Sequence, residues 1–421
     1  MTHLPRLAAC VLAGSLVGMP AWAQSAAPPP AAPPAASPAT SASVSLRDAL
    51  DAAWQRAVSA READGQRRRA DAERSVAGRL WAAAPTLELS YRDDRFQSDA
   101  GVRETEVGIA VPLWLPGQKA ARTGTADGAV ALAQAAEQAA RLRLAGELRE
   151  AAWQLASLQA EFHQAEAQAD ALRQLANDVE RRVRAGDLAR ADSLAAQAEH
   201  LAAAAAVGDT RQRLQAAKAR WTLLTGLTAS PDLSAGTFID TASDTARHPE
   251  WRLANHATEL ARKRVDLMRQ SRRDAPELTV GVRQDAPGRG QASQSSLVVG
   301  LRLPFGTDDR NQPLEAAALS DLDIAQTQEQ RLRERLDSEL ASARDAERSA
   351  QAQLDAETAR ARLLRERATL IDKSFRAGET PLPDLLRALG AAAQADSAAA
   401  RQTAALGLAR ARLQQALGLL P

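Results

Sequence analysis

The sequence Val-Gly-Ile-Ala-Val-Pro-Leu at residues 107–113 returns as Val-Gly-Leu-Arg-Leu-Pro-Phe at residues 299–305, with Pro112 matching Pro304 at a shift of 192 residues. The tetrapeptide Arg-Ala-Gly-Asp at 184–187 returns at the same shift, as Arg-Ala-Gly-Glu at 376–379. Landmarks that keep one register over such a distance indicate an internal duplication. The sequence therefore predicts two copies of one unit.

The N-terminus has the features of a secretory signal peptide. Arg6 supplies a positive start, residues 7–17 are mostly apolar, and Ala-Trp-Ala at 21–23 matches a cleavage site. We expect residues 1–23 to be removed and residues 24–45, rich in Ala, Pro and Ser, to form an extended linker. In an alternative reading Leu-Ala-Ala-Cys at 7–10 is a lipobox and Cys10 carries lipid. Cys10 is the only cysteine, so cleavage at residue 23 leaves no disulfide or thiolate chemistry.

The charge balance excludes one class of partner. The chain has 53 Lys and Arg residues against 52 Asp and Glu residues. A balanced chain lacks the basic footprint of a nucleic-acid-binding protein. We therefore expect no nucleic-acid partner.

Hydrophobic periodicity predicts the same plan in both units: a helix, a strand hairpin, a long helix and a return helix. Repeat 1 is expected at residues 46–226 and repeat 2 at 248–421, joined by a linker at 227–247. In repeat 1 the expected elements are helix Leu46–Trp81, strands Thr86–Asp93 and Glu104–Trp114, and helices Gln118–Arg184 and Leu188–Leu224. In repeat 2 they are helix His248–Arg273, strands Glu277–Gln284 and Ser296–Pro304, and helices Pro313–Arg376 and Pro381–Leu417, the last capped by Thr380.

The four strands alternate between apolar and polar residues. The apolar positions are Leu87, Leu89, Tyr91, Val107, Ile109, Val111, Leu278, Val280, Val282, Val299, Leu301 and Leu303. A sheet packed on a soluble core would show the same alternation, but the Ala-rich helices offer few bulky side chains to cover it. We favour lipid-facing strands, with Trp81 and Trp114 as an aromatic girdle at one interface.

Four strands do not close a membrane barrel, because the smallest barrels need about eight. An open edge in lipid leaves backbone groups without hydrogen-bond partners. The chain is therefore expected to pool its strands with copies of itself. Two copies and three copies both satisfy this argument.

The long helices carry a heptad seam, which predicts left-handed coiled-coil packing. Its members in repeat 1 are Leu155, Leu158, Phe162, Ala165, Ala169, Leu172, Ala176, Val179 and Val183. The 192-residue shift gives seven apolar residues of nine in repeat 2, with Glu347 and Glu357 as the exceptions. These two glutamates are expected either at a solvated edge or facing a polar interior.

The repeated tetrapeptides are expected at the helical tips furthest from the strands. We expect Arg184, Gly186, Asp187, Arg376, Gly378 and Glu379 to form a docking surface. A second hypothesis gives the tip carboxylates, with Asp192 and Asp384 among them, a role in closing an aperture by pairing with arginines such as Arg190 and Arg387. Solvated turn charges, worth about 0–1 kcal/mol each, are the simpler alternative.

The sequence offers no catalytic constellation. Histidines 163, 200, 248 and 256 have no metal-ligand spacing, and no glycine-rich phosphate loop follows a strand. We expect no enzymatic activity, no cofactor and no bound metal.

Together these features resemble the TolC-like outer-membrane factor family of tripartite efflux systems, over essentially all of the expected mature chain. Residues 111–119 also resemble the strand-to-helix junction of its heavy-metal branch. Ala57-Val58 departs from the Asn-Pro of many relatives, whereas His248-Pro249 keeps the proline. The resemblance implies a mainly α fold with membrane β: a homotrimer with a shared twelve-stranded barrel above a periplasmic α-barrel.

The resemblance also implies a function and partners. It implies an outer-membrane duct that passively exports small solutes, with heavy-metal cations as one candidate class. The partners would be a periplasmic adaptor at the tips, an inner-membrane pump reached through it, and outer-membrane lipid. The alternatives are the outer-membrane component of a type I protein secretion system and a soluble periplasmic coiled-coil adaptor.

Overall fold

A computed structural model describes residues 43–96, 100–234, 245–305 and 308–421. The expected signal peptide, Cys10 and the linker up to residue 42 lie outside the described residues, as does the middle of the expected inter-repeat linker. Within the described residues no helix is long and apolar enough to cross a membrane.

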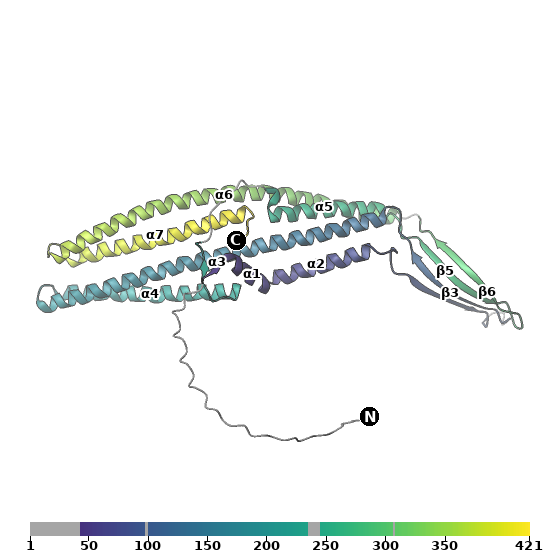
Figure 1. Ribbon diagram of the computed structural model, residues 1–421, viewed down its shortest axis with the longest axis horizontal. Helices are drawn as coiled ribbons and strands as arrows, with labels where there is room; N and C mark the ends of the chain where they lie inside the picture. The colour runs from purple at the N-terminus through teal and green to yellow at the C-terminus, as the bar shows by residue number, and fades with distance from the viewer. Residues whose placement is uncertain (1–42, 97–99, 235–244, 306–307) are drawn as a thin grey trace, which may run out of the picture. The chain divides into compact units, whose positions relative to one another are not determined.

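The elements follow one order twice (Figure 1). The first half contains α1 (Leu46–Arg56), α2 (Val58–Ala77), β2 (Thr86–Asp93), β3 (Arg103–Pro112), α3 (Gln118–Ala185) and α4 (Arg190–Thr225). The second half contains α5 (Pro249–Gln270), β5 (Glu277–Ala286), β6 (Gln294–Arg302), α6 (Asp308–Arg376) and α7 (Leu382–Ala416). Two short strands, β1 (Val44–Ser45) and β4 (Pro231–Asp232), pair in parallel, and a 3-10 turn (Thr245–Arg247) precedes α5.

The prediction of one helix at Leu46–Trp81 is wrong. The chain leaves the helix at Ala57, whose backbone is extended (ψ 138°), and α2 ends at Ala77, before Gly78. The duplication explains the break, because Ala57 matches Pro249, where α5 begins. Gly226 packs against Arg56 just as Gly418 packs against His248, so both copies turn at the same place.

Several expected boundaries also shift. Thr380 is not the N-cap of α7: Pro381 holds that position, and the Thr380 hydroxyl instead lies 2.6 Å from the hydroxyl of Ser374. Strands β3 and β6 end at Pro112 and Arg302, earlier than expected, and Pro304 has no N–H for the ladder. Helix α6 begins at Asp308 and contains Pro313 near its start.

The four long strands form one antiparallel sheet in the order β2-β3-β5-β6. The two expected hairpins, β2–β3 and β5–β6, therefore lie side by side, joined through β3 and β5. The register aligns Leu87, Ile109, Val280 and Val299 in one cross-strand row. The alternation read from the sequence thus continues across all four strands.

The helices pair as two long hairpins, α3 with α4 and α6 with α7, and α7 also packs against α3 (Figure 1). The predicted seam lies on the buried side of α3, where Leu155, Leu172 and Val179 are buried. In repeat 2, Glu347 is half-buried and pairs with Arg410 of α7 at 3.2 Å. Glu357 pairs within its own helix with Arg360, also at 3.2 Å.

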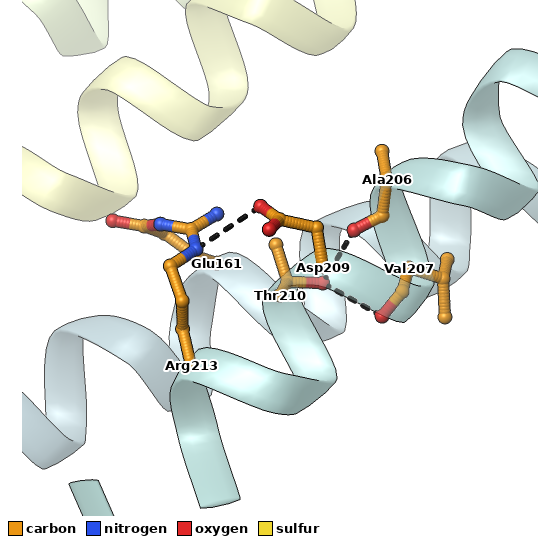
Figure 2. A network of polar contacts seen from close by, with 6 residues as sticks. All are labelled: Glu161, Ala206, Val207, Asp209, Thr210 and Arg213. Carbon is orange, nitrogen blue, oxygen red and sulfur yellow. Dashed lines mark hydrogen bonds and ion pairs between the residues drawn. The ribbon is translucent and has the colours of Figure 1, made fainter. Parts of the chain in front are cut away.

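Polar contacts join α3 to α4 outside the apolar seam (Figure 2). Arg213 of α4 pairs with Glu161 of α3 at 3.0 Å and with Asp209 of its own helix at 3.2 Å. The buried hydroxyl of Thr210 donates to carbonyls one turn earlier, so it leaves no unmet hydrogen bond in the core.

Candidate functional site: the sheet and the helical tips

One face of the sheet is apolar and exposed. Leu87, Leu89 and Leu297 expose about three quarters of their surface, and their row neighbours Ile109, Val282 and Val299 more than half. No element within the described residues covers this face. A continuous exposed apolar area of this kind is typical of a surface that contacts a membrane or another protein, and is unusual for a surface that faces water.

The opposite face of the sheet is polar. Arg283 of β5 pairs with Glu104 of β3 at 2.7 Å and with Asp285 at 3.0 Å. Nearer the helices, Gly108 and Gly281 face each other, and a Cβ on Gly281 would lie 2.6 Å from the Val107 carbonyl. The close approach of β3 and β5 at this point requires glycine, so Gly108 and Gly281 place no side chain on the polar face there.

Strands β2 and β6 are the edges of the sheet, each paired on one side only within the described residues. Their outer N–H and C=O groups can therefore pair with another chain. Long exposed edges of this kind are a template for strand addition.

The two tryptophans lie at the helix end of the sheet. Trp114 Nε1 donates to the carbonyl of Arg79 at 3.3 Å, and the Ala82 amide donates to Pro112 at 3.0 Å. Trp81 therefore lies at about the level of Trp114. A girdle at that level remains our interpretation.

Both helical tips turn through the same hydrogen-bonded motif. Gly186 and Gly378 have positive φ, 89° and 82°, and the following amide reaches back to Arg182 in one copy and Ser374 in the other. This is the Schellman arrangement, which needs a left-handed residue at the helix end. A Cβ would meet no neighbour at either glycine, so the backbone angle alone requires it.

The tip charges pair differently from the aperture hypothesis. Arg184 pairs with Glu180 at 3.8 Å and Arg376 with Asp372 at 2.9 Å, each within its own helix. Asp192 accepts a hydrogen bond from the Ala189 amide at the start of α4. The one expected pair that forms is Asp384 with Arg387, at 2.8 Å.

An apolar cluster joins the two tips. Val179 of α3, Ala196 of α4, Phe375 of α6 and Leu385 of α7 are buried together. The guanidinium of Arg182 lies 5.1 Å from the centre of the Phe375 ring, a cation–π contact between the two hairpins. The tips are thus fixed to each other within one chain.

A groove of about 760 Å³ runs beside this cluster, between α3 and the α6–α7 hairpin. Ala171 and Asp178 border it from α3, and Leu386 and Ala393 from α7. The small side chains of Ala171 and Ala393 leave the groove unfilled at these two positions.

A buried arginine, which the sequence reading missed, joins α3 to the C-terminal end. Arg149 donates to the Gln415 side chain at 2.6 Å and to the Leu419 carbonyl at 2.8 Å. Burial among neutral acceptors lowers the Arg149 pKa to about 10. The one sign of Arg149 in the sequence is a difference between the two repeats, because the matching residue of the second repeat is Ala341.

His248 lies close by, at the start of α5. Its Nδ1 accepts a hydrogen bond from the Glu250 amide at 3.2 Å and so caps the helix. Burial lowers the pKa of His248, and nearby Glu250 partly opposes this. The neutral ring is the form that can accept at Nδ1.

Among the described residues no group of three or more His, Cys, Asp or Glu side chains is placed to hold a metal ion. The geometry is that of two surfaces, the sheet and the tips, connected by long helices.

No protein-family model matches the chain. Its fold matches three solved structures: CusC, described as forming a transmembrane channel (TM-score 0.74, 15% identity), the outer-membrane channel OprN (0.72, 22%) and the outer membrane protein VceC of Vibrio cholerae (0.68, 17%). Each match covers 89% of this chain and, in turn, 92%, 89% and 96% of the solved chain. The chain therefore has the fold of an outer-membrane channel protein.

In sequence the chain is 26% identical over 253 residues to the cobalt-zinc-cadmium resistance protein CzcC of Cupriavidus metallidurans. The match spans 58% of each protein, so the chain covers somewhat over half the length of that relative. Together these findings confirm the resemblance to the TolC-like outer-membrane factors and the expected mainly helical fold with a four-stranded sheet.

Proposed function

We propose that this chain is the outer-membrane duct of a tripartite efflux system, which lets small solutes pass from the periplasm to the exterior. The observation that carries the proposal is the sheet, with one exposed apolar face and one polar face in register over four strands. Lipid would cover the first face and water the second. The duct would be passive, with no enzymatic step of its own.

The open edges support a homotrimer. Pairing β2 of one copy with β6 of the next would satisfy both edges, and three copies give about twelve strands. The same three chains would supply six helical hairpins to a tunnel. The resemblance to trimeric ducts favours three copies over two.

The tips support the choice of partner. Both tip turns are exposed and share one backbone geometry, so a repeated helical element of a periplasmic adaptor would meet similar surfaces. Arg184, Gly186, Asp187, Arg376, Gly378 and Glu379 would form this docking surface, and the inner-membrane pump would be reached through the adaptor. The name of the relative CzcC supports heavy-metal cations as the substrate class.

Conductance in planar lipid bilayers tests the proposal. Purified protein added to one side is expected to produce discrete open-channel currents. Because sheet and tunnel would need several chains, dissociated monomer serves as the control and is expected to give none. Protein that inserts as an oligomer and still conducts no ions would overturn the duct.

Fractionation separates the duct from the soluble adaptor alternative. A duct remains with outer-membrane fractions and requires detergent for extraction, whereas a coiled-coil adaptor is recovered from the periplasm without it. Type I protein secretion is distinguished by cargo: deletion of the gene would abolish export of a protein and leave metal tolerance unchanged.

Closure of an aperture by the tip charges is a further part of the proposal. Of the carboxylate–arginine pairs that we expected, only Asp384 and Arg387 pair within a single chain. Contacts of Asp187 and Arg190 across chains would be needed. Charge reversal of Arg190 and Arg387 is expected to raise conductance; unchanged conductance would reject the idea.

A further inference from the structure

Three basic residues lie where the first hairpin of the sheet meets the helices. Arg79 follows the end of α2, and Lys119 and Arg122 lie in the first turns of α3. The Trp114 indole connects them, because its Nε1 donates to the Arg79 carbonyl at 3.3 Å and the Arg122 guanidinium lies 5.8 Å from the centre of its ring. Lys119 and Arg122 are one helical turn apart and therefore lie on the same side of α3. We call Arg79, Lys119 and Arg122 the junction cluster.

The positive charge of the junction cluster is not compensated by the chain itself. In the part of the chain that the structure describes, none of its three side chains makes an ion pair, and Arg79 and Arg122 are exposed. The next carboxylate along α3, Asp127, pairs with Arg74 of α2 at 2.8 Å. Because like charges on neighbouring side chains repel one another, an anion from outside the chain would stabilise the cluster.

The junction cluster lies at the end of the apolar face of the sheet. Leu80 and Trp81, directly after Arg79, expose 68% and 39% of their surface. Leu303 and Phe305, just after β6, expose 56% and 85%. Exposed apolar and indole side chains that are directly followed by basic ones are typical of the level of the lipid headgroups in a membrane.

The second repeat lacks the junction cluster. At the positions that match its three cations, the second repeat has Ser271, Asn311 and Leu314. The same corner is closed there without an indole, since the Asn311 amide donates to the Arg272 carbonyl. The fold of the corner therefore does not require the basic residues, and their charge points to a ligand that only the first repeat binds.

We propose that the junction cluster binds the headgroup phosphate of an anionic phospholipid in the leaflet that faces the periplasm. The arginines and the lysine donate to the phosphate oxygens, and Trp114 lies between the headgroup and the hydrocarbon. The inference rests on the proposed function, because it requires the sheet to lie in the membrane. It goes beyond that function by naming a lipid class and by assigning its site to one repeat, so that each chain holds one such lipid instead of two.

Lipid titration tests the site, with native mass spectrometry of the full-length protein in mild detergent. The two probes are phosphatidylglycerol, which is anionic, and phosphatidylcholine, which carries a phosphate but no net charge. The parent protein is expected to bind phosphatidylglycerol more tightly. Arg79→Gln, Lys119→Gln and Arg122→Gln in one chain should abolish this preference, since each basic residue beside an anionic lipid contributes about fivefold to binding.

A matched control removes the same charge elsewhere. Arg331→Gln, Arg362→Gln and Arg367→Gln change three exposed arginines of α6. Arg331 is the one closest to the sheet, and it lies about 35 Å along α6 from Asp308, at about 1.5 Å per residue. The control is expected to keep the parent preference. An equal loss in the control would show that only net charge matters and would overturn the site.

A conservative variant separates binding from a structural role. Arg79→Lys with Arg122→Lys keeps the charges and is expected to keep the preference for phosphatidylglycerol. Loss of the preference in this variant, with an unchanged melting temperature, would contradict an electrostatic headgroup site.

Two further outcomes distinguish the ligand and the level at which the account fails. Treatment with inorganic phosphate at constant ionic strength is expected to leave the lipid bound; displacement of the lipid by phosphate would overturn the lipid assignment. If the protein conducts ions in bilayers but shows no preference for phosphatidylglycerol, the headgroup site is wrong and the duct stands. If it is recovered without detergent and binds neither lipid, the duct fails as well.

Discussion

Helices α4 and α7 occupy the same place in the two repeats, yet their surroundings differ. Both lie wholly within the described residues; α7 buries eleven residues and α4 seven. Helix α7 packs along both α6 and α3, whereas α4 packs mainly on α3, with smaller contacts to α1 and α7, and exposes Leu194, Leu201 and Leu223. Matching positions of the two repeats therefore form the same helices but do not make the same contacts. The exposed side of α4 is where we expect another chain to bind.

The contact of α7 with α3 has features that α4 lacks. Gly407 lets α7 approach so closely that a Cβ would lie 2.1 Å from the Trp153 ring, and Arg412 makes two hydrogen bonds to Glu150. The matching residues of Gly407 and Trp153 are Gln215 and Asp345. These two contacts hold α7 against α3 within the chain.

The largest expected effect breaks this close approach. Gly407→Leu would force a side chain into the Trp153 ring, an overpacking cost of about 1–3 kcal/mol. Leucine favours a helix over glycine by up to about 1 kcal/mol, so a net loss of stability shows that the clash dominates. Thermal unfolding followed by circular dichroism measures it.

Gly390→Leu is the matched control, because a Cβ at that glycine of the same helix would meet no atom within 4 Å beyond its own turn of helix. It is expected to leave the melting temperature unchanged or higher. Equal losses in the two variants would contradict the role assigned to Gly407.

The next effect concerns Arg149. Arg149→Ala leaves the Gln415 and Leu419 acceptors unmet, at about 1–3 kcal/mol. Arg149→Met fills the volume without a buried charge and is expected to cost less, since the desolvation of the guanidinium is removed. If methionine proves as costly as alanine in the same unfolding experiment, the burial argument is wrong.

A smaller effect should be equal in the two copies. Gly186→Ala and Gly378→Ala place a Cβ on a left-handed residue, which costs about 1–2 kcal/mol. Neither site has a neighbour to clash with, so both variants should lower the melting temperature alike. A clear difference between them would mean that the tips are not equivalent.

The smallest effect is a dependence on pH. Because the pKa of His248 is lowered in the folded chain, its contribution to stability is complete above about pH 6.5, the ordinary histidine value, and declines as the pH falls below it. The charged groups that act on this ring are Glu250, Glu339 and Arg335. The His248→Asn variant keeps an acceptor that caps the helix but does not titrate in this range. It should therefore lose less stability than the parent protein as the pH is lowered. Identical stability profiles against pH for the two proteins would contradict this.

The sequence predicted the duplication, the order of elements and the alternation of the strands, because these depend on local periodicity. It missed the break at Ala57, because the first copy has no proline or glycine there, whereas the second copy has Pro249 at the matching position. It also missed Arg149, since burial depends on how α7 crosses α3, which no local pattern encodes. Within one chain Arg376 pairs with Asp372 on the preceding helical turn, a contact that the sequence reading did not anticipate.

The central claim is that this sheet is closed in the outer membrane by other copies of the chain. Native mass spectrometry of protein extracted from outer membranes in mild detergent measures the number of chains directly. The account predicts a particle of three identical chains. A single chain that stays soluble without detergent would contradict it.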